Sequence, residues 1–280
     1  MQPLPLKQSE SIKQVMNAAI LRTAGNLQNL CMTTANTAQT QFYNSINMAY
    51  MEVSTGVKSY TQAIIDTIRN LSSQGAIITY PSGVKRSLES AVRTNVVTAI
   101  NQNCGKLQEL RADEMDWDLM ELTAHSGARP EHAHWQGKIV SRSGQKGYLS
   151  LDDIGYGTAT GFKGVNCRHD WYPYYKGSAR TYTQKELNKW KNEKVEYNGK
   201  KISRYEATQK QRYFERKIRQ NKKDLKAQQA ILTSNDENID IKQVQDEIRN
   251  IKANEKANRE ALDNFLKQTG LRKDNSRLVI

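Results

Sequence analysis

The chain has 280 residues, of which 37% are apolar, with a mean hydropathy of −0.78 and a net charge of +13. This length is enough for a core in one or two compact units, which excludes a mini-protein held together by disulfides alone. No stretch approaches the roughly 20 apolar residues that cross a bilayer, and the start MQPLPLKQSE lacks the pattern of a signal peptide, so we expect a soluble protein with no membrane partner.

The first long stretch, residues 9–74, is predicted to be helical. Apolar residues recur near a 3.6-residue spacing in its first and last parts, and Gly56 and Gly75 are predicted to stop helices. Between these parts, residues 32–51 are rich in Thr, Asn, Gln and Ala. A helix with such a small and polar face is expected to pack against other helices or subunits.

A second long helix is predicted over residues 85–110, after a turn at Tyr80-Pro-Ser-Gly83. Its apolar side consists of Leu88, Val92, Val96, Val97, Ile100 and Leu107. The composition then changes, because residues 117–175 hold three of the four Trp, eight of the 16 Gly and all four His. We expect a compact, loop-rich module there, with strands at 119–124 and 138–141.

The last third of the chain is predicted to return to helix. Two capping-box patterns, in which a hydroxyl and a carboxylate satisfy free N–H groups at a helix start, occur at Thr183 with Glu186 and at Ser203 with Glu206. Polar helices are expected over 203–232 and 239–268, with Gly270 closing the second one.

These elements predict an α+β fold that is mainly α. Three segments are expected: a helical region at 1–115, a compact His/Cys/Trp-rich module at 116–180 and a basic helical hairpin at 181–280. The hairpin offers only a narrow apolar stripe, as in a two-helix coiled coil or a partner-binding helix. The stripe consists of Ile241, Val244, Ile248 and Ile251.

Positive charge is concentrated in the C-terminal part. The first 175 residues hold 16 Lys and Arg against 14 Asp and Glu, whereas the remaining residues hold 26 against 15. A basic surface of this kind is typical of a polyanion partner, and equally of a solvated, Lys-rich helix face. The three cysteines, Cys31, Cys104 and Cys167, are far apart and odd in number, which favours assembly in a reducing, intracellular compartment over a disulfide framework.

Residues 125–169 carry a dense set of side chains that bind metals. The candidates are His125, His132, His134, Cys167 and His169. Four nitrogen or sulfur donors suffice for tetrahedral zinc (Zn), but the paired donors here have one residue between them, whereas zinc fingers usually have about two to four. Three interpretations stay open: a hydrogen-bonded loop scaffold, a zinc site and a catalytic site.

A catalytic site needs a nucleophile or a base in a fixed position. Cys167 beside a histidine, with Asp170 or Glu131 as the orienting carboxylate, is one arrangement, and His132 with Glu131 as a general base is another. In a strand, Cys167 and His169 share a face, but they are roughly 6–7 Å apart at the base, too far for an assured hydrogen bond. No catalytic residue is therefore assigned.

Several long runs that contain Trp and His follow one another along the chain. They are AHSGARPEHAHWQGKIVS at 124–141, GYG at 155–157, GVNCRHDWYPYYKG at 164–177 and YEATQKQRYFERKIRQNK at 205–222, preceded by AYMEVSTGVKSYTQAI at 49–64, YPSG at 80–83 and LESAVRTNVVTAINQ at 88–102. In this order they resemble the phage minor capsid protein 2 family. The residues of this motif that we expect to be structural are Gly127, Arg129, Pro130, Trp135, Gln136, Gly137, Gly155, Tyr156, Gly157, Asn166, Arg168, Trp171 and Pro173.

The resemblance implies a minor structural protein of a tailed-phage head that takes part in head morphogenesis. Such a protein is expected near the portal through which DNA passes, in few copies, with portal or major capsid proteins and further copies of itself as partners. The family is similar to the Mu-type head morphogenesis proteins, whose C-terminal modules also end in a segment with Asn-Cys-Arg. Less helical sequence precedes the runs than the resemblance leads us to expect, which suggests a shorter variant or a prophage remnant.

A basic helix face agrees with this role. Residues 203–228 hold nine Lys and Arg against three acids. Five of them recur at a spacing of three or four and line one face: Arg212, Arg216, Arg219, Lys223 and Lys226. Such a stripe can follow a phosphate backbone without reading bases, so we expect non-specific contact with double-stranded DNA.

Two other functional classes stay open. One is a metal-dependent hydrolase or nuclease that uses the His/Cys cluster. The other is a phage-delivered effector, because head proteins of the Mu type can bear toxin modules. Against the effector, residues 178–280 contain no compact catalytic-looking segment beyond the predicted hairpin.

Overall fold

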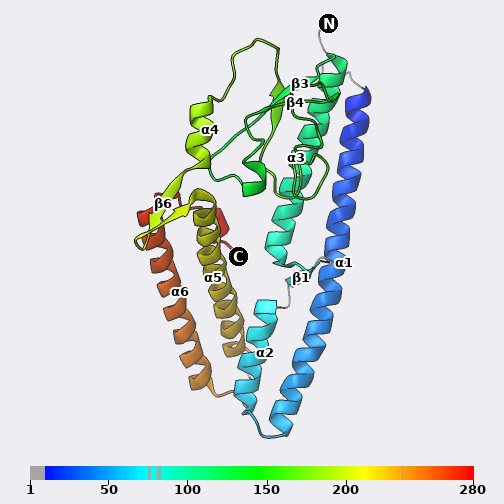
Figure 1. Cartoon of the computed structure of the whole chain (residues 1–280). Coiled ribbons are helices and arrows are strands. Elements are labelled where there is room, and N and C mark those ends of the chain that lie inside the picture. Colours follow the sequence, from blue (N-terminus) through cyan, green and yellow to red (C-terminus); the bar gives the residue numbers. More distant parts are fainter. Residues whose placement is uncertain (1–9, 75–76, 81–82, 235) are drawn as a thin grey trace. The chain divides into compact units, whose positions relative to one another are not determined.

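The computed structural model describes residues 10–74, 77–80, 83–234 and 236–280 (Figure 1). It is mainly helical with small antiparallel sheets, which confirms the predicted α+β class. The chain divides into two compact units. The loop unit consists of the described residues of 1–30, 89–194 and 203–205, and the hairpin unit consists of those of 31–88, 195–202 and 206–280. Whether the three segments expected from composition fold as separate domains stays a prediction.

The first helix, α1, is continuous from Glu10 to Ser54. The predicted stop at Gly56 is confirmed, because this residue adopts a left-handed φ of 73° just after the helix. Helix α2 follows at Tyr60–Gln74, and the predicted stop at Gly75 lies outside the described residues. Within the described chain, no helix is both long enough and apolar enough to cross a membrane.

The predicted start of the next helix at Lys85 is wrong. A hairpin precedes it, in which β1 (Ile77–Thr79) pairs antiparallel with β2 (Lys85–Ser87), and α3 then runs over Leu88–Glu114. The turn residue Tyr80 donates its N–H to the carbonyl of Val84 at 2.9 Å, which brings the residues after the turn back beside β1. The chain therefore forms a short ladder before it becomes helical.

The loop unit contains a small sheet in the order β4-β3-β5. Its central strand β3 (Leu119–Leu122) pairs antiparallel with β4 (Ile139–Ser141) and with β5 (Trp171–Pro173), and a 3₁₀ turn spans Pro130–His132. The strands expected at 119–124 and 138–141 are thus confirmed, whereas β5 was not predicted. The core against this sheet consists of Ala112, Met120, Leu122, Trp135, Val140, Ile154, Phe162, Cys167 and Trp171.

Helix α4 (Gln184–Lys191) ends the loop-rich segment. Its predicted capping box is confirmed, because the Thr183 hydroxyl accepts from the Glu186 N–H and the Glu186 carboxylate accepts from the Thr183 N–H at 2.9 Å. A second hairpin then pairs β6 (Lys194–Tyr197) with β7 (Lys200–Ser203).

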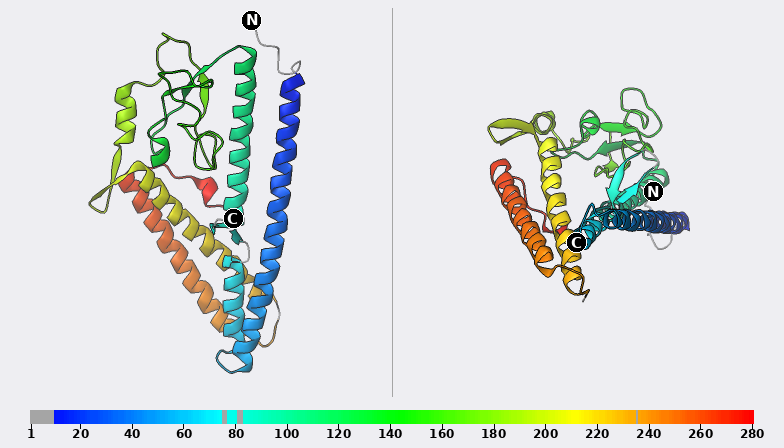
Figure 2. Two further views of the ribbon diagram at one scale, coloured as in Figure 1. Left: turned by 45° about the vertical axis from the view of Figure 1, so that its right-hand side comes forward. Right: turned by 90° about the horizontal axis from the view of Figure 1, so that it is seen from below.

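The two long helices of the hairpin unit are α5 (Arg204–Leu232) and α6 (Ile241–Thr269), with a 3₁₀ turn after them at Asn275–Arg277. They lie side by side as an antiparallel pair (Figures 1 and 2). The predicted close at Gly270 is confirmed by its φ of 67° and by its N–H, which donates to the Leu266 carbonyl at 2.9 Å. Phe214 of α5 meets Phe265 of α6 with ring centroids 5.6 Å apart.

The narrow apolar stripe of α6 packs against α2 as well as α5. Val244 and Ile248 are buried in a cluster with Ile65 of α2 and Ile231 of α5, whereas Ile241 is exposed. Burial of apolar surface contributes about 25 cal/mol of stability per Å². The contact with α2 therefore stabilises a hairpin whose surface is mostly polar. The partner of the stripe thus comes from the same chain.

Candidate functional site

The His/Cys motif is held in the loop unit by one face of α3. The N–H of Asn166 donates to the Thr98 hydroxyl at 3.0 Å, and the Asn101 amide donates to the Cys167 carbonyl at 2.7 Å. The Gln102 amide donates to the Lys163 carbonyl at 3.1 Å. Residues three or four apart share a helix face, so these polar side chains clamp the loop that carries Cys167.

Lys163 is a buried cation within this clamp. Its ammonium donates to the Asn101 amide oxygen at 2.8 Å and to the Asp170 carboxylate at 2.7 Å. The side chain passes over Gly105 of α3, where a Cβ would lie 3.0 Å from its Cε atom. A buried charge is tolerated only when it is paired and hydrogen-bonded, and both conditions are met here.

The loop before Cys167 is too tight for side chains at one of its glycines. A Cβ on Gly164 would lie 2.5 Å from the Thr158 carbonyl oxygen and 2.6 Å from that of Ala159. The Gly164 carbonyl in turn accepts the Cys167 N–H at 3.0 Å. Gly164 therefore sets the close backbone approach that positions Cys167.

Three of the five candidate metal ligands meet in the interior of the loop unit. One donor atom from each of His132, Cys167 and His169 lies within 4.8 Å of the other two. The two Nδ1 atoms of the histidines are 3.3 Å apart, and the Cys167 Sγ lies 3.7 Å from the Nδ1 of His169. These side chains are 1–2% exposed. The chain thus gathers two imidazoles and a thiol from two separated segments.

Each imidazole of this cluster is held by a contact of its other ring nitrogen, Nε2. The Nε2 of His132 lies 2.7 Å from the Thr160 carbonyl oxygen, and the Nε2 of His169 lies 3.2 Å from the amide oxygen of Gln136. Burial lowers the pKa of His169 to about 2 and also lowers the pKa of His132, so both are neutral at pH 7. Burial raises the pKa of the Cys167 thiol.

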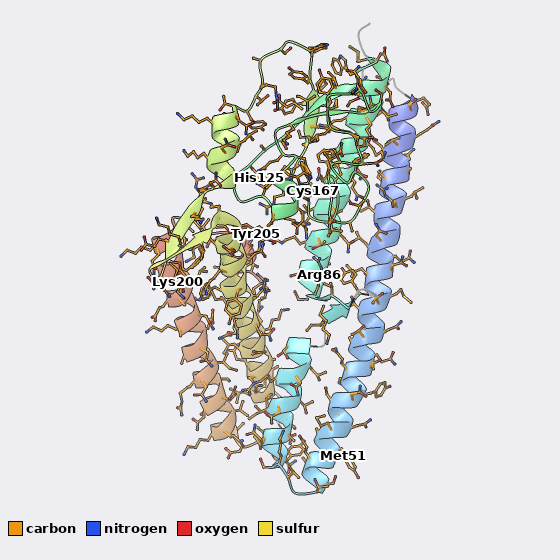
Figure 3. All side chains as sticks on the ribbon, in the orientation of Figure 1. Met51, Arg86, His125, Cys167, Lys200 and Tyr205 are labelled. Atoms are coloured by element: carbon orange, nitrogen blue, oxygen red, sulfur yellow. The ribbon has the colours of Figure 1, made fainter. Side chains whose placement is uncertain are left out.

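The other two histidines lie differently. His125 stacks on His169 with ring centroids 4.5 Å apart, and Figure 3 labels it beside Cys167. Its Nδ1 is 3.0 Å from the Ser126 carbonyl, and its Nε2 is buried with no partner among the described residues. His134 is exposed, with its Nε2 3.4 Å from the Asp153 carbonyl. The structure therefore brings three candidates together, places His125 beside them and leaves His134 outside.

The arrangement does not favour a cysteine nucleophile. A reactive thiol is partly exposed and has a lowered pKa, whereas Cys167 is buried and its pKa is raised. The two expected orienting carboxylates are elsewhere engaged or exposed: Asp170 accepts from Lys163 and from the Trp171 N–H, and Glu131 is exposed. No catalytic residue is assigned from this geometry.

The expected structural motif residues mostly brace the same loops. Arg129 donates to the Val165 carbonyl, and the Tyr156 hydroxyl donates to Glu109 of α3. Asn166 adopts a left-handed φ of 55°, and Arg168 is exposed. The remaining members lie in the buried core, at turns with positive φ or in the short elements: Gly127, Pro130, Trp135, Gln136, Gly137, Gly155, Gly157, Trp171 and Pro173.

The predicted basic stripe lies on α5 of the hairpin unit. Arg216 and Lys226 are exposed, whereas Arg212, Arg219 and Lys223 are half-buried. The Arg219 guanidinium donates to the Arg277 carbonyl of the C-terminal segment, so this side chain also has a structural role. The opposite side of the helix is buried through Ala207, Phe214 and Ile218.

The model of one protein family, described as phage minor capsid protein 2, matches residues 1–262 of the chain. The chain belongs to this family. A relative from Lactococcus phage LL-H, named "Structural protein", is 31% identical to this minor capsid protein over 220 residues, which are 74% of the chain and 56% of the relative. The chain thus spans little more than half of that relative's length.

A second relative of the minor capsid protein, from Lactococcus phage mv4, is also named "Structural protein". It is 34% identical over 108 residues, which are 37% of the chain and 79% of the relative. No solved structure matches. The family and the two relatives make the chain a structural protein of a bacteriophage and a component of the virion.

Several residues that build the site were missed from the sequence. They lie on the polar face of α3 and in the loop that it clamps: Thr98, Asn101, Gln102 and Lys163. The pattern that could have indicated them is a row of small and polar residues at helical spacing, which also includes Gly105 and Ala112. The apolar residues of the same helix lie on another face, which their spacing favoured as the buried one.

Proposed function

We propose that this minor capsid protein is a non-enzymatic component of the phage head that takes part in head morphogenesis, binding portal or major capsid subunits through α1 and packaged double-stranded DNA through α5. The observation that carries the proposal is the surface of α1. Of the described residues of this helix, only Ile12, Ala19 and Leu30 are buried. The large apolar side chains that are at least 45% exposed are Met16, Ile20, Leu21, Met32, Phe42, Tyr43, Ile46, Met48, Tyr50 and Met51.

The apolar side chains of α1 support a protein partner. Phe42, Ile46 and Tyr50 follow one another at four-residue spacing, so they share one side of the helix. A contiguous apolar patch of this kind is unusual on a monomer and typical of a subunit interface. In a virion component, the neighbours available to cover it are the other head proteins.

Co-purification from cells that express the portal and major capsid proteins tests this contact. The triple variant Phe42→Asp/Ile46→Asp/Tyr50→Asp should lose at least about ten-fold in recovery of the partner, because burying three charges without partners costs several kcal/mol. Asn44→Asp, on the opposite side of α1, should bind as the wild type does. Equal recovery with the triple variant and the wild type would contradict docking through α1.

The exposed basic residues of α5 support a DNA contact. Arg216 and Lys226 are both exposed on α5, away from the side buried through Ala207, Phe214 and Ile218. Neutralising phosphates releases condensed counterions, so the affinity is expected to fall steeply with salt and to be independent of sequence. This suits a protein that meets a genome of arbitrary sequence.

Fluorescence anisotropy with a mixed-sequence duplex, measured over a series of salt concentrations, tests the DNA contact. Arg216→Gln/Lys226→Gln should reduce the slope of log affinity against log salt by about 2, one for each lost phosphate contact. The matched control Lys252→Gln/Lys256→Gln removes the same charge from exposed positions on α6 and should keep the slope. If the wild type shows no binding at low salt, or both variants change alike, the DNA contact through α5 is wrong.

A further inference from the structure

The hydrogen bonds behind the two buried histidines determine which of their nitrogens carry hydrogen. A carbonyl oxygen can only accept, so the Nε2 of His132, 2.7 Å from the Thr160 oxygen, is a donor. The Gln136 atom near His169 is an acceptor as well, because the same oxygen accepts the backbone N–H of His125 at 3.1 Å. A neutral imidazole has one N–H, so the Nδ1 atoms of both His132 and His169 are bare.

These two bare nitrogens face each other 3.3 Å apart in the protein interior. Two lone pairs at this distance have no hydrogen to share, and a buried polar atom without a partner costs free energy. The thiol of Cys167, 3.7 Å from the Nδ1 of His169, can donate its one hydrogen to one nitrogen only. A cation between the three atoms satisfies all of them at once.

We propose that His132, Cys167 and His169 form a structural zinc site in the loop unit. In a tetrahedral site with Zn–N of about 2.05 Å and Zn–S of about 2.3 Å, two nitrogens are about 3.3 Å apart and a nitrogen and a sulfur are about 3.6 Å apart. The observed separations are 3.3 Å and 3.7 Å. Two of the three separations between the donors therefore already match the spacing that the ion requires, and the third, between Cys167 and His132, is within 4.8 Å.

The surroundings match those of a zinc site. Histidine ligands normally donate their other N–H to a carbonyl or carboxyl group, as His132 does to Thr160 and His169 does to Gln136. A thiolate with two imidazoles is a donor set that zinc accepts and that magnesium and calcium do not. The grouped donors of the described residues supply three ligands and not a fourth; His125 stacks on His169, and its buried Nε2 has no partner among the described residues, so its ring is the nearest candidate for the remaining position.

Burial assigns the ion a structural rather than a catalytic role. A catalytic zinc keeps an open position for water and substrate, whereas the three ligands here are 1–2% exposed. His132 follows strand β3, and Cys167 and His169 precede strand β5. The ion thus joins two loops, because Cys167 lies 35 positions after His132 in the chain. The segment between them has little regular secondary structure to stabilise it.

The test is the zinc content and thermal stability of the full chain. A Cys31→Ser/Cys104→Ser background removes the two exposed thiols as adventitious ligands. After dialysis against micromolar zinc and then against metal-free buffer, we expect about one zinc per chain by mass spectrometry, and a Tm that falls by roughly 5–10 °C on chelation and returns with zinc but not with magnesium. With cobalt, the protein should show the visible bands of a tetrahedral ion and a thiolate charge-transfer band.

Matched variants identify the ligands. Cys167→Ser should lose the charge-transfer band and His169→Asn most of the bound metal, whereas the exposed histidine variant His134→Ala should keep both. If these variants do not fold, the wild-type titration still decides. A folded wild type that binds less than a tenth of an equivalent, or whose Tm does not respond to zinc, overturns the proposal. So does undiminished binding by both ligand variants, and a zinc-loaded protein that nicks plasmid DNA overturns the structural role.

Discussion

Replacing Gly164 by alanine tests whether the loop before Cys167 is as tightly packed as its geometry indicates. The added Cβ would lie 2.5 Å from the Thr158 oxygen, about 0.9 Å short of the 3.4 Å at which ordinary contact begins. It would also lie 2.6 Å from the oxygen and 2.8 Å from the carbonyl carbon of Ala159. These are backbone atoms, and the Ala159 oxygen is held by the Val165 N–H at 2.8 Å, so they cannot turn away.

The expected loss is worked out from this overlap. Overpacking a core costs about 1–3 kcal/mol, and overlap with three backbone atoms places Gly164→Ala at the upper end. Loss of glycine's freedom in the unfolded chain returns about 0.4–1 kcal/mol, which leaves a net loss of about 2–3 kcal/mol. For a unit of this size, each kcal/mol lowers Tm by about 2–4 °C, so we expect a fall of roughly 5–10 °C.

Thermal unfolding followed by near-ultraviolet circular dichroism suits this measurement, because Trp135 and Trp171 lie in the affected core. The control is Gly25→Ala in α1, where a Cβ has nothing within 4 Å. It should be neutral or stabilise the helix by up to about 1 kcal/mol. A Gly164→Ala protein that unfolds within 1 °C of the wild type would refute the close approach.

Two further predictions concern other parts of the fold. Phe265→Ala should destabilise the hairpin unit by about 3–5 kcal/mol in urea unfolding, because the ring is fully buried, whereas Val279→Ala, at an exposed position, should have little effect. In the capping box, the N–H and the hydroxyl of Thr183 lower the pKa of Glu186. The stabilisation that the ionised Glu186 gives the fold is therefore complete above the ordinary carboxyl pKa and is lost as the pH falls through the lowered pKa. Glu186→Gln should flatten this part of the stability curve between about pH 5 and 3, and an unchanged curve would contradict it.

The long helices and two strands could be predicted because their evidence is local. Apolar spacing indicated the helices, and glycines at Gly56 and Gly270 ended two of them in left-handed conformations, as expected. The hairpin of β6 and β7 was missed although its turn was visible. Asn198-Gly199 has the positive φ values, 50° and 72°, that favour this dipeptide in two-residue hairpins.

The packing of α3 could not be predicted from its own sequence. The apolar residues Val92, Val96, Val97 and Ile100 suggested the buried side, yet each is at least 37% exposed. The loop unit instead packs on the face that carries Asn101, because a loop full of backbone donors and acceptors needs polar partners. Which face a helix buries depends on what lies against it, and that partner is distant in the sequence.

The composition of the His/Cys cluster was predicted only in part for a related reason. His132 and His134 were both candidates, but a 3₁₀ turn over Pro130–His132 precedes further turns, and the structure buries His132 and exposes His134. Cys167 and His169 approach to 3.7 Å because they lie in a loop and not in a strand, which no spacing rule indicates. The sequence indicated which side chains can act as metal donors, but only the fold shows which of them lie close together.

Helix α1 has a consequence for the order of events in building a particle. Its 45 residues rise about 67 Å, yet they bury only three side chains, so its hydrogen bonds receive little protection from the rest of the described chain. Amide hydrogens along it should exchange rapidly in the free protein and slowly in the virion. If α1 docks on other subunits as proposed, part of the free energy that orders this helix comes from them, so the protein would become rigid only once they are in place and its addition to a growing assembly would be reversible until then.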